Sequence, residues 1–267
     1  MESQGTPRYV QNIFSWLGSV EKHQMKDGCK DGTEFRPLQI VLSVDYSAKW
    51  DRFLKKPASS SEFDLIYLVD VSGSMSSSLK GVKEYCKAIS EKLEKELPQF
   101  DFKYGGIFYS DPVDVSSEKN IYLNLTSDIN EFKSFVTNVP LLSGGDGPED
   151  WYGAYDTAVN NISWRDGIRC IIHITDAGAH GTDYSSGDGH PAEGPKLDRI
   201  IPKCAKMNFH IFGFNIGSTA NQSFERFRSI FNANGGKSFE LKEFNPDNNI
   251  GTNFSSMVVE SVRTCAS

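Results

Sequence analysis

Residues 63–75 read FDLIYLVDVSGSM, and the fold class can be inferred from this segment. Its first seven residues are almost continuously apolar, which is typical of a parallel strand that is buried on both faces. Asp70, Ser72 and Ser74 follow at once, and a segment with apolar residues at helical spacing comes next. Three oxygen-bearing side chains therefore stand in the turn between a central strand and a helix.

The rest of the chain alternates between strand and helix patterns. Strands are predicted at residues 102–109, 121–125, 168–175, 209–216 and near 239. Helices are predicted over residues 79–97, 129–139, 152–162 and 196–206, around the phenylalanines of 224–231, and over 254–262. Alternation of this kind favours a doubly wound, mostly parallel α/β sheet with helices on both faces.

The main domain is expected to span residues 61–267. Residues 1–60 are interpreted as an N-terminal extension, with an amphipathic helix over 9–24, a candidate edge strand over 38–44 and a polar connector. The sequence shows no internal repeat or low-complexity tract.

Composition and charge exclude some functions. With 267 residues and 38% hydrophobic content the chain can form a sizeable core, and its net charge of -7 argues against general binding to nucleic acid or anionic membrane. No secretory signal or membrane-spanning stretch is recognised. Five cysteines without a CxxC pair make a disulfide framework unexpected and favour a cytoplasmic protein. The alternative is an extracellular location, reached by a non-signal route or as a processed fragment.

Three loops are expected to meet at one edge of the sheet, because ligands bind at the carboxyl ends of the strands in such folds. The first is DVSGSM at 70–75, the second is SGGDGPEDW at 143–151, and the third is TDAGAHG at 175–181. Each alone has a purely structural interpretation as a helix cap or a turn. Together their oxygen ligands suit Mg²⁺, Mn²⁺ or Ca²⁺ rather than zinc or copper.

These loops carry a family resemblance. DVSGSM resembles the metal-ion-dependent adhesion site of von Willebrand factor A (vWA) domains, and GGDGPED with ITDAGAHG resembles the second and third loops of the integrin β subclass. The chain is also similar to the A domains of eukaryotic proteins with an atypical α-kinase domain, whose third loop shares the residues Asp176, Ala177, His180, Gly181 and Tyr184. The resemblance covers residues 61–245.

The resemblance implies a role for each site residue. Ser72 and Ser74 would bind the ion through their hydroxyls, and Glu149 would be the second-loop ligand. The remaining acids are Asp70 and Asp176, which would act mainly through water, and Asp146, which would be a neighbouring acid. Mg²⁺ tolerates such a site because it keeps several waters. An Asp or Glu of a protein partner would complete the coordination, which implies a metal-dependent interaction module and not an enzyme.

The sequence departs from the integrin β pattern at two places. Ser76 and Ser77 stand where that family has paired acids for an adjacent regulatory ion, and Gly144 stands where it has an amide ligand for a flanking calcium. The auxiliary ion sites are therefore expected to be absent.

Two other functions stay open. A phosphoryl-transfer enzyme of the haloacid dehalogenase type needs a second Asp two residues after its nucleophile, and Ser72 occupies that position. No GxSxG elbow is present, and the sequence around Lys237 has Phe231 where a phosphate-binding loop needs its first glycine. The third class is a structural vWA module without bound metal.

Other conspicuous residues are interpreted conservatively. His173 alternates within a buried strand and is predicted to be a core histidine. His180 and His190 are expected to shape the rim beside the metal, since nothing in their spacing indicates a zinc site. Trp151 and Tyr152 lie near the metal face, where packing is the favoured interpretation and contact with a partner is the alternative.

Overall fold

The computed structural model describes residues 62–111, 120–142, 145–182, 188–216, 219–243 and 251–266. The chain divides into two units, Met1–Lys56 and Pro57–Ser267, and every described residue belongs to the second. The helix predicted over 9–24 and the strand predicted over 38–44 lie outside the described residues.

Six strands form one sheet in the order β3-β2-β1-β4-β5-β6. Only β3 is antiparallel to its neighbour, and the other four pairs are parallel. This confirms the predicted mostly parallel, doubly wound sheet. The strands are β1 (Glu62–Asp70), β2 (Asp101–Tyr109), β3 (Ile121–Thr126), β4 (Ile168–Thr175), β5 (Phe209–Asn215) and β6 (Ser238–Glu243).

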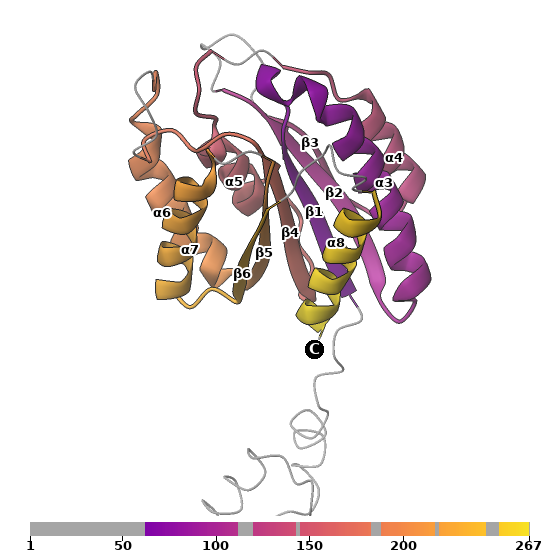
Figure 1. Cartoon of the computed structure of the whole chain (residues 1–267). Helices are drawn as coiled ribbons and strands as arrows, with labels where there is room; N and C mark the ends of the chain where they lie inside the picture. Colours follow the sequence, from indigo (N-terminus) through magenta and orange to yellow (C-terminus); the bar gives the residue numbers. More distant parts are fainter. Residues whose placement is uncertain are drawn as a thin grey trace, which may run out of the picture. The chain divides into compact units, whose positions relative to one another are not determined.

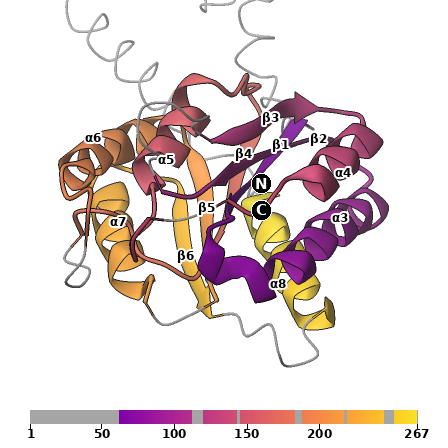
Figure 2. The same cartoon turned by 90° about the horizontal axis from the view of Figure 1, so that it is seen from above.

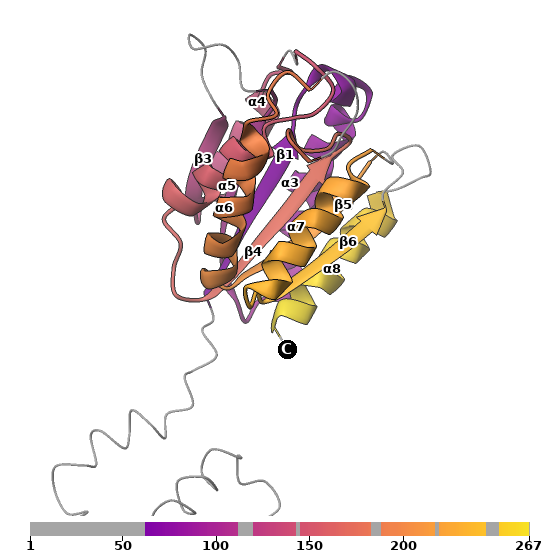
Figure 3. The same cartoon turned by 90° about the vertical axis from the view of Figure 1, so that its left-hand side faces the viewer.

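Helices cover both faces of the sheet (Figure 1 and Figure 3). One face carries α3 (Leu79–Glu96), α4 (Ile129–Asn138) and α8 (Gly251–Ala266). The opposite face carries α5 (Trp151–Asn160), α6 (Glu193–Lys206) and α7 (Asn221–Ala233). A short 3₁₀ helix, η2 (Gly73–Ser77), comes between β1 and α3.

The central strand β1 supplies both halves of the core. Leu65 and Tyr67 pack into the layer under α3, α4 and α8, whereas Ile66 and Leu68 pack under α5, α6 and α7. Side chains of a strand alternate between its faces, so a strand buried on both sides is apolar at most of its positions. Burying each such side chain contributes about 1.5–3 kcal/mol, which explains why residues 63–69 specify the centre of the fold.

The register brings the ends of three strands to one edge, which Figure 2 shows from above. Asp70, the last residue of β1, pairs with Tyr109, the last residue of β2. On the other side of β1, Val69 pairs with Ile174 of β4, one residue before that strand ends. The loops that follow β1, β2 and β4 therefore begin side by side, as predicted for the first and third loops.

Candidate metal centre

The first and third loops converge through side-chain oxygens. The Ser72 and Ser74 hydroxyls lie 3.0 Å apart, and Ser74 Oγ donates to Asp176 Oδ1 at 2.9 Å. The fully buried Asp70 carboxylate accepts hydrogen bonds from Ser72 N at 2.9 Å and Thr175 Oγ at 2.7 Å. Two hydroxyls and two carboxylates thus surround one point above the end of β1.

The serines of the first loop are not used as helix caps. Ser72 is the N-cap of η2 and Ser78 is the N-cap of α3, yet neither side chain makes a capping hydrogen bond. Ser72 is buried and Ser74 is exposed, so the cluster opens to solvent on the side of Ser74. The capping interpretation of this loop therefore has no support in the structure.

The two neighbouring acids of the second loop have different roles. Asp150 is the N-cap of α5 and accepts from Gly153 N at 2.7 Å, as a helix cap should. Glu149 instead joins the third loop through its backbone, because its N–H donates to Gly178 O at 2.9 Å and its carbonyl accepts from His180 N at 3.3 Å. This bridge holds the Glu149 side chain toward the first loop, where it hydrogen-bonds to Ser72.

Glu149 carries a buried oxygen that no hydrogen bond satisfies among the described residues. The residue is only 2% exposed, and the unsatisfied atom is its Oε2. An unsatisfied buried oxygen of this kind is costly unless an ion, water or proton completes it.

The charges of the cluster are unfavourable in the absence of a cation. Burial raises the pKa of Glu149 to about 10, and the nearby Asp70 and Asp111 carboxylates add to the shift. Burial also raises the pKa of Asp70 to about 6 and that of Asp176 above its usual value. A divalent cation among these oxygens would relieve the repulsion, and an all-oxygen donor set fits Mg²⁺, Mn²⁺ or Ca²⁺.

Five of the six predicted site residues are thus brought together: Asp70, Ser72, Ser74, Glu149 and Asp176. The sixth, Asp146, contacts a different group of residues, and its Oδ2 accepts a hydrogen bond from Gly189 N.

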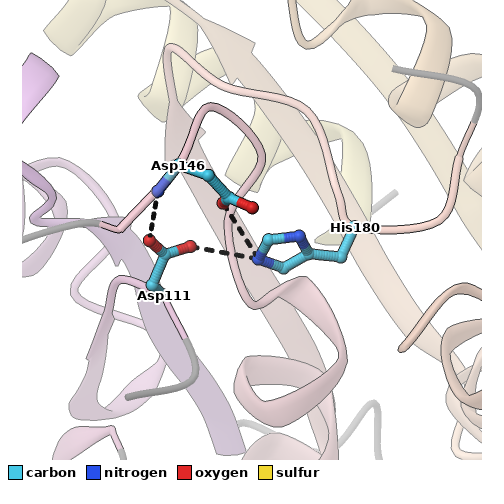
Figure 4. A group of neighbouring side chains, drawn as sticks. All are labelled: Asp111, Asp146 and His180. Carbon is cyan, nitrogen blue, oxygen red and sulfur yellow. Dashed lines mark hydrogen bonds and ion pairs between the residues drawn. The ribbon is translucent and has the colours of Figure 1, made fainter. Parts of the chain in front are cut away.

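A second cluster contains Asp111, Asp146 and His180 (Figure 4). One ligand atom from each lies within 4.8 Å of the others. His180 Nε2 is 3.0 Å from Asp111 Oδ1 and 3.8 Å from Asp146 Oδ1, and the latter oxygen is buried without a hydrogen-bond partner among the described residues. Asp111 also accepts from the backbone N–H groups of Gly145 and Asp146, so it connects the second loop to the third.

The other nitrogen of His180 is held by a carboxylate. His180 Nδ1 lies 2.8 Å from Asp188 Oδ1, and Asp188 accepts from Gly181 N at 2.7 Å and His190 N at 2.8 Å. Gly181 has φ +68, and a Cβ there would lie 2.5 Å from Pro191 O, so only glycine fits. Carboxylate support of this type is typical of metal-binding histidines.

The same contacts also stabilise a protonated His180. Burial acts to lower the pKa of His180, but its hydrogen bonds to Asp111 and Asp188 outweigh this and raise that pKa above the usual value. For Asp111, burial acts to raise the pKa, but hydrogen bonds from His180 and the second-loop N–H groups outweigh it and lower that pKa. The cluster can therefore hold either a metal ion or an imidazolium among carboxylates.

Asp111 is not among the site residues that the sequence pattern predicts. This residue follows β2 almost directly, so the rule that singled out Asp70 and Asp176 at strand ends could have found it. The expected absence of auxiliary ion sites rests on Ser76, Ser77 and Gly144, and Gly144 lies outside the described residues. The cluster of Asp111, Asp146 and His180 offers a candidate position that this expectation overlooked.

Two aromatic neighbours of the site belong to the core. His173 is fully buried, with Tyr109 Oη 2.5 Å from its Nε2 and Tyr155 Oη 3.1 Å from its Nδ1, which confirms a core histidine. Trp151 is also fully buried, and its ring centroid lies 4.5 Å from that of Phe224. The packing interpretation of Trp151 is therefore confirmed.

None of the helices in the described ranges is long and apolar enough to cross a membrane.

Comparison with known proteins identifies relatives in two groups. The chain is 32% identical over 154 residues to the α-protein kinase vwkA of Dictyostelium discoideum, a match that covers 56% of this chain and 24% of the relative. It is 29% identical over 182 residues to integrin β-1 of Gallus gallus, which covers 59% of this chain and 22% of that protein. The chain thus spans about a quarter of the length of these relatives. No family model matches the sequence.

Among solved structures, the fold is similar to that of proximal thread matrix protein 1 from the mussel byssus. The TM-score is 0.51 at 13% identity, over 74% of this chain and 45% of that one. A likeness at this identity concerns the fold alone. Because its sheet is mostly parallel and six-stranded and its sequence is similar to vwkA and integrin β-1, the chain contains a von Willebrand factor A-like domain.

Proposed function

We propose that this domain is a protein-binding module that depends on a divalent cation. The ion is held by the Ser72 and Ser74 hydroxyls and by Glu149, while Asp70 and Asp176 act through water. The observation that carries the proposal is the buried Glu149 Oε2, which has no hydrogen-bond partner among the described residues although its carboxyl group hydrogen-bonds to Ser72. Mg²⁺ suits the site best, because it needs few carboxylates and retains water ligands.

The open side of the cluster indicates where a partner binds. Ser74 is exposed, whereas Ser72 and Glu149 are buried, so a partner reaches the ion from the side of Ser74. Neutral hydroxyls and water-mediated carboxylates leave the ion incompletely neutralised. An anionic oxygen from an Asp or Glu of the partner is therefore the ligand that gains most from the open position.

The second cluster supports the same function. The Asp111 carboxylate accepts a hydrogen bond from the second-loop backbone and also contacts His180 of the third loop, and Glu149 lies in the same second-loop segment. Whether it holds a cation or an imidazolium, the cluster stabilises the position of Glu149.

The test uses Mn²⁺ in place of Mg²⁺, since electron paramagnetic resonance measures the free ion directly. The full chain is expected to bind one Mn²⁺ at this site, and the double variant Ser72→Ala, Ser74→Ala is expected to lose it. A short neutral peptide with one aspartate, acetyl-Gly-Asp-Gly-amide, should then alter the spectrum of the bound ion. Its asparagine counterpart is the control and should not.

Two outcomes would contradict different parts of this proposal. Wild-type protein that binds no ion would support the structural module without metal. An ion that is bound but ignores the aspartate peptide would contradict the carboxylate-binding function while leaving the metal site intact.

The enzymatic alternative has its own test. The residue two positions after Asp70 is Ser72, whose hydroxyl cannot act as the general acid of a phosphoryl transfer. We therefore propose that the chain is not an enzyme, and that the purified chain with Mg²⁺ does not hydrolyse p-nitrophenyl phosphate. Metal-dependent release of phosphate that disappears in Asp70→Asn would support the enzyme instead.

The domain boundaries and the cellular compartment are further parts of the proposal. We propose that the binding domain comprises residues 61–267 and that residues 1–60 form an extension, which limited proteolysis tests. Cys86, Cys170, Cys204 and Cys265 are buried and free, which supports a reducing, cytoplasmic location. Fractionation of cells that express the full chain tests the location.

A further inference from the structure

A group of thiol, imidazole and hydroxyl side chains lies at the edge of the sheet opposite the metal centre. Cys170 of β4 pairs in register with His210 of β5, and His210 pairs with Ser238 of β6. All three are at the amino-terminal ends of their strands. Cys265, near the end of α8, packs into the same core layer as Cys170.

The side chains of this group contact one another. The Cys170 thiol hydrogen-bonds to the Cys265 sulfur, and Cys265 also hydrogen-bonds to His210. His210 Nδ1 lies 2.6 Å from Ser238 Oγ. Cys170 is fully buried, whereas Cys265 retains 9% exposure, so a small molecule reaches Cys265 first.

From this geometry we propose that Cys265 and Cys170 form a peroxide-sensitive pair, in which Cys265 reacts with the oxidant, Cys170 resolves it, and the resulting disulfide fastens α8 to β4. The two thiols are already in contact, and Cys265, which retains a small exposed fraction, also lies beside an imidazole. Nothing in their sequence spacing indicated this pairing.

The reaction balances with a hydroperoxide as the oxidant. The Cys265 thiolate attacks the peroxide oxygen, which breaks the O–O bond and gives a sulfenic acid, and the released alkoxide or hydroxide takes up a proton. The Cys170 sulfur then attacks the sulfenic sulfur. Hydroxide leaves with the Cys170 proton as water, and the S–S bond forms.

The surroundings favour Cys265 as the reacting thiol. The hydrogen bond from Cys170, followed by the contact with His210, lowers the pKa of Cys265 to about 6 against the opposing effects of burial and of Glu240. The thiolate is the nucleophilic form, so Cys265 is reactive at neutral pH. Burial has the opposite effect on the pKa of Cys86 and Cys204, which it raises far above the usual value. These two thiols therefore serve as internal controls.

The experiment uses the full chain with Cys29→Ser, which removes the cysteine outside the described residues. After one equivalent of hydrogen peroxide, the intact mass should fall by two hydrogens. Trypsin cuts after Arg169 and Arg263, so the product should contain a peptide that begins at Cys170 linked to one that begins at Thr264. Dithiothreitol should reverse the change, and the melting temperature of the oxidised form should rise because the disulfide closes a long loop.

Variants identify the role of each residue. Cys265→Ser should abolish oxidation, whereas Cys170→Ser should leave a sulfenic acid at Cys265 that dimedone traps. The matched control Cys204→Ser should form the disulfide as the parent does. His210→Gln should move the pH midpoint of Cys265 alkylation upward from about 6.

Two results would overturn the proposal. The first is oxidation at Cys86 or Cys204 with no linkage between Cys170 and Cys265. The second is a Cys170→Ser variant in which Cys265 is not trapped by dimedone, because the first step would then not occur at that thiol.

Discussion

Binding of Mg²⁺ should release a proton from Glu149. The pKa of this carboxyl is raised to about 10, and a metal ligand must be deprotonated. Since pH 7 lies about three units below that pKa, removal of the proton costs about 4 kcal/mol of the binding free energy. The observed dissociation constant should therefore fall about tenfold for each unit of pH between 7 and 9. Asp70, with a pKa of about 6, adds a second proton only below this window.

Isothermal titration calorimetry in buffers of different ionisation enthalpy measures the proton release. Wild-type protein at pH 7.5 should release about one proton for each Mg²⁺ bound. Glu149→Gln should bind more weakly, release no proton and show a dissociation constant that does not depend on pH. Asp150→Asn is the matched control, because the adjacent acid caps α5 and does not contact the ion, so proton release should persist.

Wild-type protein that binds Mg²⁺ with the same affinity at pH 7 and pH 9 and releases no proton would contradict this prediction. The ion would then be held away from Glu149, and the unsatisfied Oε2 would need a different explanation.

Four further predictions concern stability, its pH dependence and partner binding. In thermal melts, Mg²⁺ at about a hundredfold over its dissociation constant should stabilise the wild type by roughly 2.7 kcal/mol, and the double variant of Ser72 and Ser74 should lose this response without gaining stability. Glu149→Gln should be at least as stable as metal-free wild type, whereas Asp70→Ala should not, because the Asp70 carboxylate accepts two hydrogen bonds whose donors would lose their partner. Without metal, the free energy of unfolding should fall as the pH rises from 7 to 9, because Glu149 and His180 have raised pKa values and the folded state holds their protons more tightly. Chemical denaturation at a series of pH values should find a smaller decrease per pH unit in Glu149→Gln than in the wild type. Any protein partner captured in Mg²⁺ should be released by EDTA, and a complex that survives the chelator undiminished would contradict the metal-dependent interaction.

The sequence predicts the strands and helices well because their patterns are local. The almost continuous apolar run at 63–69 identifies the central strand, and the helical spacing after 79 identifies the helix that covers it. Convergence of the first and third loops follows from the topology, since parallel strands end at a common edge. The extension at residues 1–60 remains a prediction.

The remaining features depend on contacts that the sequence pattern does not contain. Glu149 and Asp150 are adjacent acids, and only the start of α5 decides that Asp150 caps the helix and leaves Glu149 for the site. Asp111 meets His180 across 69 residues of sequence. An odd number of cysteines without short spacings likewise indicated no pairing, although Cys170 and Cys265 are in contact.

The backbone bridge between Glu149 and Ala179 makes two loops mechanically dependent on each other. The second-loop ligand and the third loop that carries Asp176 share two hydrogen bonds, so neither loop can shift without displacing the other. Replacing Ala179 by a bulkier residue would therefore change the geometry around the ion although Ala179 offers it no ligand, since the side chain of Ala179 is almost fully buried. In the proposed site, affinity for the ion would thus change through a residue that has no polar side-chain atom, with every proposed ligand left intact.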